Sequence, residues 1–262
     1  MIKSKPLFLK NTSGINYRSI DFTILQLLQR NIHLGASTEF SLLSSQWFIA
    51  GVRQKFTILN LNFTVSYYRR FLILVELIIF TRKHILFVNE RKYFDKAVSD
   101  IASSVGEPFV MGRWVGGTLT NFKKVMVAYN ILLKNKSFNS LTRYKWNLKQ
   151  SLDGLSVLNS LPGALFFNST KNNFWASREA YSLRIPSASI TDSDSYPSDI
   201  LYPIPGNDDA FGSIYFLNQL LAKSILISKM SLLLNFGRKF HFSEDWENLR
   251  GGKLNAKSRR DI

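Results

Sequence analysis

The chain has 262 residues, of which 45% are hydrophobic and 20% are charged, and this apolar content is enough for one folded core with appendages. It contains no cysteine, which excludes disulfides, thiolate metal sites and a cysteine nucleophile. Lys and Arg number 34 against 18 Asp and Glu, for a formal net charge of +16 at pH 7. Such a charge favours a polyanionic partner, most simply nucleic acid. A basic surface that serves only solubility is the alternative.

Two apolar runs are too short or too interrupted to predict a membrane span. Residues 71–80 are about half of the ~20 residues needed and contain Glu76, and residues 225–236 are interrupted by Lys229. We therefore expect no membrane partner. Residues 1–20 contain basic side chains and no acidic one, which predicts either a basic arm or an organellar transit peptide.

Hydrophobic periodicity predicts strands that alternate with helices along most of the chain. Strands are predicted over 56–61, 84–88, 108–111, 164–167 and 187–190. Helices are predicted over 22–30 with Asp21 as N-cap, 64–82, 93–103, 174–183 and 209–230, and residues 116–134 are predicted to form a loop followed by a helix. Alternation of this kind indicates an α/β fold in which a parallel sheet carries helices on both faces. The continuous apolar character of 84–88 is typical of a strand buried on both faces.

Changes in composition divide the chain into five segments. These are a basic N-terminal arm (1–20), a first part of the α/β core (21–133), an inserted basic helical excursion (134–158), a second part of the core (159–230) and a charged C-terminal tail (231–262).

The sequence carries no enzymatic signature. The glycines at 112, 116 and 117 do not match the dinucleotide-binding spacing, and Gly252-Lys253 is followed by Leu254 rather than by the Ser or Thr of a phosphate-binding loop. The three histidines are scattered, and no G-x-S-x-G motif is present. We expect no catalysis, no cofactor and no small-molecule substrate, although a nucleotide-binding enzyme on the same fold remains the rival.

Carboxylates gather near two predicted strand ends. Asp192 and Asp194 follow the strand at 187–190, and Asp208 and Asp209 precede the last helix. Asp192, Asp194 and Asp208 are weak candidates for a structural Mg²⁺ site. Helix capping by Asn207 and Asp208 is the simpler interpretation, and we expect no metal.

The basic residues occur in groups, which predicts several contacts with RNA phosphates. In the excursion, Tyr144 and Trp146 alternate with Arg143 and Lys145, as base-stacking surfaces often require. Trp114 is expected either to fill the core or to join the binding surface, and Arg113 to pair with RNA or with an internal carboxylate. The candidate RNA-binding residues are Arg53, Lys55, Arg69, Arg70, Arg113, Lys123, Lys124, Lys134, Lys136, Arg143 and Lys145.

Several strings, in order, resemble blocks of one family. They are Asp21 to Gly35 (DFTILQLLQRNIHLG), Phe48 to Lys55 (FIAGVRQK), Ile85 to Val88, Arg113 to Asn121 (RWVGGTLTN), Leu161-Pro162, Glu179-Ala180, Ile185-Pro186 and Tyr202 to Ala210 (YPIPGNDDA). This series is similar to the bacterial and organellar small ribosomal subunit protein 2 family and covers about residues 21–230.

The resemblance implies a three-layer flavodoxin-like fold with an inserted, shortened helical hairpin, and a non-catalytic protein. It implies small-subunit ribosomal RNA and neighbouring ribosomal proteins as partners. Ala36, Asn89 and Gly163 depart from the family pattern, which puts an inherited ion site in doubt. This drift, together with heavy use of Phe, Ile, Asn and Lys, indicates a mitochondrial ribosome, with a plastid as the alternative.

Overall fold

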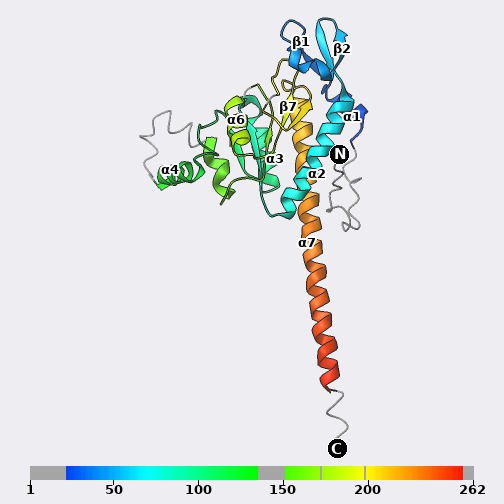
Figure 1. The fold of residues 1–262 in the computed structure, drawn as a ribbon, viewed down its shortest axis with the longest axis vertical. Helices are drawn as coiled ribbons and strands as arrows, with labels where there is room; N and C mark the ends of the chain where they lie inside the picture. Colours follow the sequence, from blue (N-terminus) through cyan, green and yellow to red (C-terminus); the bar gives the residue numbers. More distant parts are fainter. Residues whose placement is uncertain (1–21, 135–150, 172, 198, 256–262) are drawn as a thin grey trace, which may run out of the picture.

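The computed structural model describes residues 22–134, 151–171, 173–197 and 199–255, with the backbone alone for 132–134 and 235–255 (Figure 1). Its centre is a five-stranded parallel sheet in the order β5-β4-β6-β7-β8. This is the 2-1-3-4-5 order of flavodoxin-like folds. The predicted α/β class is therefore confirmed. The strands are β4 (Ile85–Asn89), β5 (Phe109–Met111), β6 (Ala164–Phe167), β7 (Ser187–Thr191) and β8 (Tyr202–Pro205).

Helices cover both faces of this sheet, and alternate side chains of each central strand face opposite layers. Ile85 and Phe87 belong to one core cluster with α2 (Leu61–Phe80), α3 (Asp95–Ser104) and α7 (Phe211–Asn255). Leu86 and Val88 belong to a second cluster with α4 (Phe122–Lys134), the 3-10 turn η5 (Asp153–Val157) and α6 (Phe174–Ser182). All five residues of β4 are buried, as its continuous apolar run predicts. The predicted three-layer arrangement is confirmed.

A second, antiparallel sheet lies beside the parallel one. It has the order β1-β3-β2, from β1 (Leu34–Ser37), β2 (Ile49–Arg53) and β3 (Phe56–Leu59). The prediction that 56–61 belongs to the parallel sheet is wrong. Gln54 and Lys55, both with positive φ, form a two-residue hairpin turn that reverses the chain. Turns of this kind usually contain Asn or Gly, so Gln54-Lys55 does not predict one.

Strand β8 supplies the fifth parallel strand, which the hydrophobic pattern did not predict. It contains two prolines, Pro203 and Pro205, and proline cannot donate to a ladder of hydrogen bonds. Strand β8 pairs with β7 alone and forms an edge of the sheet, which is where prolines are tolerated.

The limits of the first and last helices differ from the predicted ones for identifiable reasons. Helix α1 (Ile24–Gln29) is capped by Thr23, which forms a capping box with Gln26, whereas Asp21 lies outside the described residues. The sequence predicts that the last helix ends at 230, but the backbone of α7 continues to Asn255 and extends away from the sheet in Figure 1. No proline follows Pro205, so nothing in the later sequence forces the helix to end. The structure also contains two further 3-10 turns, η2 (Leu43–Phe48) and η3 (Lys92–Phe94).

The first half of α7 is a core helix. Its residues 211–234 are long and apolar enough to cross a membrane, with a mean hydropathy of 1.2, but 44% of the most apolar window is buried within the protein. Ile214, Leu217 and Leu221 are buried in the cluster that includes α2 and α3. The Tyr68 hydroxyl of α2 also donates to the Leu217 carbonyl at 2.6 Å. Packing on the sheet accounts for the apolar composition.

The wholly buried carboxylate of Glu107 joins α7 to the amino end of β4, where that strand begins at Ile85. The Lys229 ammonium of α7 lies 2.5 Å from Glu107 Oε1 and donates to the Val105 carbonyl at 2.6 Å. Glu107 Oε2 accepts from the Ile85 backbone N–H at 2.8 Å and lies 3.2 Å from His84 Nδ1. Removing the ammonium leaves a buried charge with fewer partners.

We predict that Lys229→Met lowers the free energy of unfolding by roughly 2–4 kcal/mol, because Glu107 then loses its cation. The matched control is Lys223→Met, on the exposed side of the same helix, which should change it by less than about 0.5 kcal/mol. Urea unfolding of the full chain measures both values. Equal losses in the two variants would contradict the assignment.

Candidate nucleic-acid interface

The space outside the carboxyl ends of the parallel strands is where flavodoxin-like folds usually bind ligands, and here the protein's own amides occupy it. Asn218 of α7 donates to Asn168 Oδ1 at 2.7 Å, and Asn168 donates to Asn89 Oδ1 at 3.4 Å. Asn89 in turn donates to Asp95 Oδ1 at 2.7 Å. The three asparagines are buried. This chain of hydrogen bonds joins the ends of β4 and β6 to α3 and α7.

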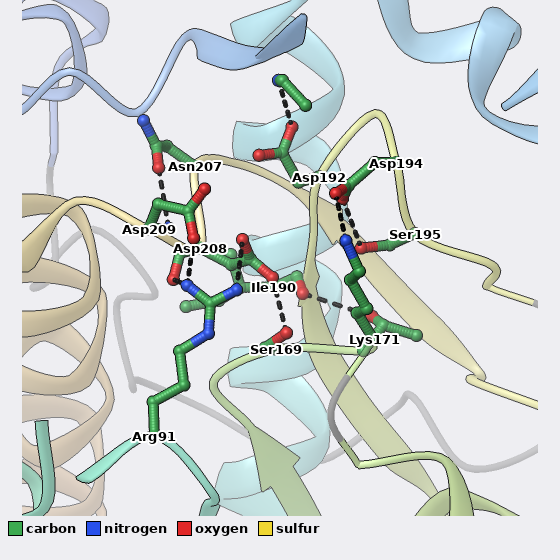
Figure 2. Close-up of polar contacts among 12 residues, drawn as sticks. Arg91, Ser169, Lys171, Ile190, Asp192, Asp194, Ser195, Asn207, Asp208 and Asp209 are labelled. Carbon is green, nitrogen blue, oxygen red and sulfur yellow. Dashed lines mark hydrogen bonds and ion pairs between the residues drawn. The ribbon is translucent and has the colours of Figure 1, made fainter. Parts of the chain in front are cut away.

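An arginine occupies the neighbouring space (Figure 2). The Arg91 guanidinium, which follows β4, pairs with the carboxylates of Asp208 and Asp209 just before α7, and it also donates to the Asp208 carbonyl at 2.8 Å. Ser169, after β6, donates to Asp208 Oδ2 at 2.5 Å. The ends of β4 and β6 and the start of α7 therefore meet in one charged network.

The two aspartates after β7 have different partners. Asp194 is paired with the Lys171 ammonium at 2.7 Å, as Figure 2 shows. Asp192 Oδ1 instead accepts backbone hydrogen bonds from Ser193 at 2.5 Å and from Ala36 at 3.1 Å. Because Ala36 belongs to β1, Asp192 ties the antiparallel sheet to the end of β7.

Gly35 allows this close approach. A Cβ at position 35 would lie 2.4 Å from Thr57 Oγ1 and 2.9 Å from Asp192 Oδ1, well inside van der Waals contact. Thr57 also donates to Ser193 Oγ at 2.8 Å. The antiparallel sheet is thus held against the parallel one by close-packed polar contacts.

Three carboxylates could together face a cation, but they are not the predicted three. Ligand atoms of Asp192, Asp208 and Asp209 lie within 4.8 Å of one another, whereas Asp194 pairs with Lys171. Arg91 already donates to two members of this group. The capping interpretation is wrong for both residues. Asn207 Oδ1 accepts from the backbone N–H groups of Asp209 and Ala210, which precede the first residue of α7, Phe211, and the Asp208 carboxylate faces Arg91 and Ser169.

Burial shapes the titration of this group. Desolvation raises the pKa of Asp192 to about 7, with nearby Asp208 and Asp194 adding to the rise and the Ser193 N–H opposing it. Desolvation likewise raises the pKa of Asp208 to about 6, against the hydrogen bond from Ser169 and the charge of Arg91. At pH 7 Asp192 is therefore only partly ionised, whereas Asp208 is mostly ionised and is paired with Arg91.

The described part of the chain places the predicted RNA-binding residues on the outside. Arg53 and Lys55 are exposed at the β2–β3 hairpin, and Lys123 and Lys124 in the first turn of α4. Arg69 and Arg70, on α2, are also exposed, and their guanidinium carbons lie 5.8 and 5.5 Å from the ring centroids of Phe22 and Tyr67. These groups lie on separate elements. The Lys134 side chain and all of Lys136, Arg143 and Lys145 lie outside the described residues.

The loop after β5 combines a buried Trp with an exposed Arg. Trp114 is 5% exposed and packs in the second core cluster, so of the two alternatives for this residue the structure shows the one in which it fills the core. Glu179 of α6 holds this loop by accepting hydrogen bonds from Trp114 Nε1 at 3.1 Å, Gly117 N at 2.7 Å and Leu119 N at 3.0 Å. Arg113 is left exposed at the surface of a rigid loop.

Sequence reasoning missed Arg91, Trp175 and Arg178. Arg91 follows a strand that was predicted, and the rule that strand ends converge could have linked it to Asp208. Trp175 and Arg178 were included in a predicted helix without being assigned a face. Both are exposed on α6.

The comparisons decide the family. A model of the family described as "Ribosomal protein S2" matches residues 27–228. The chain belongs to this family. It is similar to small ribosomal subunit protein uS2 of Granulibacter bethesdensis, at 32% identity over 238 residues that cover 86% of this chain and 92% of that protein. It is also similar to uS2 of Thermobifida fusca, at 33% identity with 78% and 75% covered, and to uS2 of Blochmanniella floridana, at 34% with 72% and 88% covered.

The matched residues include all five parallel strands, the carboxylates at their ends and the loop after β5. The resemblance found from separate strings of the sequence is confirmed. The flavodoxin-like architecture agrees with it.

The raised pKa of Asp192 predicts a pH dependence of stability. In the unfolded chain this carboxyl ionises near pH 4, but in the folded protein it stays protonated until about pH 7. Protonation therefore favours the folded state, and its contribution is lost as pH rises from about 4 to about 7. We expect the free energy of unfolding of wild type, minus that of Asp192→Asn, to fall by roughly 1–3 kcal/mol over this range.

Thermal or urea unfolding of the two proteins at matched pH values measures this difference. The substitution Asp100→Asn, at an exposed carboxylate, is the control and should give a difference that does not fall with pH. A flat profile for Asp192→Asn would show that the carboxyl is ionised at neutral pH in the folded protein.

Proposed function

We propose that this chain is a structural constituent of the small ribosomal subunit, which binds ribosomal RNA and neighbouring ribosomal proteins through its outer surface. Its relatives are named as small ribosomal subunit proteins, and the family is structural and non-enzymatic. The net charge of +16 suits a protein surrounded by phosphates.

The observation that carries this proposal is the distribution of polar groups over the fold. At the carboxyl ends of the strands, Asn89, Arg91 and Asp208 use their polar atoms on one another or on adjacent residues. The predicted basic residues with described side chains are all exposed, on the hairpin, α2, the loop after β5 and α4. A binding surface that is spread over several elements suits the backbone of a folded RNA better than a small molecule.

We further propose that the carboxylate group at Asp192 and Asp208 works without a bound Mg²⁺. Arg91 supplies positive charge to Asp208 and Asp209, and Lys171 supplies it to Asp194. The raised pKa of Asp192 reduces the negative charge that a cation would otherwise neutralise.

We place the protein in the mitochondrial ribosome. Heavy use of Phe, with 21 residues, and of Ile, Asn and Lys is typical of AT-rich organellar genes, and the departures at Ala36, Asn89 and Gly163 suit a diverged organellar member. The relatives named above are bacterial, which is consistent with the bacterial ancestry of both organelles. A plastid ribosome is the alternative.

Electrostatic binding to RNA predicts a steep dependence of affinity on salt. Each phosphate contact contributes roughly 0.7–0.9 to the slope of log affinity against log salt. Reversing Lys123 and Lys124 to Glu should reduce this slope by about two without unfolding the chain, because both side chains are exposed. Titration of full-length protein with small-subunit ribosomal RNA fragments at several salt concentrations measures the slope.

The matched control is Lys92→Glu with Lys96→Glu, two exposed lysines next to and on α3, on the opposite face of the sheet from α4. Neither lysine is among the predicted RNA-binding residues, so this pair should leave the slope nearly unchanged if those residues, and not basic side chains in general, bind RNA. Equal flattening by both pairs would point to non-specific attraction, and salt-independent binding would contradict the proposal altogether.

A further inference from the structure

A pocket of about 540 Å³ lies between the loop after β5 and helix α6. Its less exposed lining comes from Glu90, Trp114 and Glu179, and its exposed lining includes Arg113, Trp175 and Arg178. A volume of this size falls within the range of small-ligand sites. It is separate from the charged network around Arg91 and Asp208, which lines no part of it.

The inner part of the pocket is held rigidly. Trp114 is fixed at both its backbone N–H, which donates to Glu90 Oε1 at 3.2 Å, and its indole N–H, which donates to Glu179. Gly117, with φ of 88°, makes the left-handed turn that brings its own N–H to Glu179. A site whose lining is fixed before binding loses little entropy when a ligand is ordered in it.

The outer part of the pocket carries an aromatic side chain that the fold does not use. Trp175 is 70% exposed, although a ring of this size is normally buried. Among the described rings it contacts only Phe174, edge to face, with centroids 5.5 Å apart. The Arg178 guanidinium carbon lies 5.7 Å from the Phe174 centroid. An exposed ring beside arginines is the arrangement on which unpaired bases stack.

The charged groups of the pocket match the remaining parts of a nucleotide. Arg113 and Arg178 can each donate two parallel hydrogen bonds to a phosphate. Glu90 uses Oε1 on Trp114, and within the described residues no hydrogen bond reaches its Oε2. A carboxylate oxygen accepts from the amino group of cytosine or adenine, but uracil presents no amino donor.

We propose that this pocket binds one unpaired nucleotide of RNA, with its base stacked on Trp175, its phosphate at Arg113 and Arg178, and an amino group of the base at Glu90. The inference rests on the proposed function, since it names the site at which an RNA-binding protein would select a nucleotide. The pocket would add a preference for bases with an amino group to a surface whose other proposed contacts are with RNA phosphates.

The test uses full-length protein and single-stranded hexamers of cytidine, adenosine or uridine. We expect the cytidine and adenosine hexamers to bind several-fold more tightly than the uridine hexamer. Trp175→Ala should weaken binding of the cytidine hexamer by about 5- to 100-fold, the range that loss of one stacked base gives, with no change in salt slope. Trp175→Phe should recover part of the affinity. Arg178→Gln should instead reduce the salt slope by about one.

The control is Tyr196→Ala, which removes another ring that is 64% exposed and lines no part of the pocket. It should leave the preference among hexamers unchanged. If Trp175→Ala binds every hexamer as the wild type does, the pocket is not a nucleotide site, and a protein partner becomes the better occupant. If the uridine hexamer binds as tightly as the cytidine and adenosine hexamers, Glu90 does not select the base and the inference is overturned.

Failure of the pocket differs from failure of the proposed function. If the pocket alone is wrong, ribosomal RNA still binds with a steep salt slope that the Lys123 and Lys124 reversal flattens, and Trp175→Ala has no effect. If the proposed function is wrong, the wild-type chain shows no salt-dependent affinity for RNA of any kind.

Discussion

The interaction on which the rest of the structure depends is the contact of Arg91 with the carboxylates before α7. It joins the end of β4 to the residues that connect β8 with α7, and Ser169 brings in the end of β6. Asp208 is buried, so its charge is tolerable only with such partners. Because the same strand ends are where this fold normally binds ligands, the network that stabilises the sheet also occupies its usual binding site.

Recognition is consequently left to the outer surface. The antiparallel sheet is held in place by Asp192 and carries Arg53 and Lys55 at its hairpin. The loop after β5 is held in place by Glu179 and carries Arg113. In both cases a carboxylate accepts hydrogen bonds from backbone N–H groups of the segment and holds it in place, and the segment carries an exposed cationic side chain. A rigid scaffold with exposed cations is well suited to match the shape of a folded RNA.

The sequence predicted the central layers well, because β4 and β6 are mostly apolar runs and the helices have clear periodicity. It failed where local chemistry was ambiguous. The turn at Gln54 and Lys55 has none of the residues that favour positive φ. Strand β8 was not predicted because it contains Pro203 and Pro205, and proline is disfavoured inside a sheet. The polar site was only half predicted: Asp192 was identified from its position after a predicted strand and Asp208 from its position before the last helix, but Arg91 was not identified. Arg91 and Asp208 are brought together by the order of the strands in the sheet, and hydrophobic periodicity does not predict that order.

The central claim is that the chain works as part of a small ribosomal subunit, and sedimentation tests it most directly. A mitochondrial lysate of the source cell, run on a gradient with high magnesium and low salt, is probed with an antibody to this chain and for small-subunit RNA. The account predicts that chain and RNA sediment together, and that high salt releases the chain to the top of the gradient because phosphate contacts hold it. A chain that stays at the top at low salt, while the RNA sediments as an intact subunit, would contradict the account.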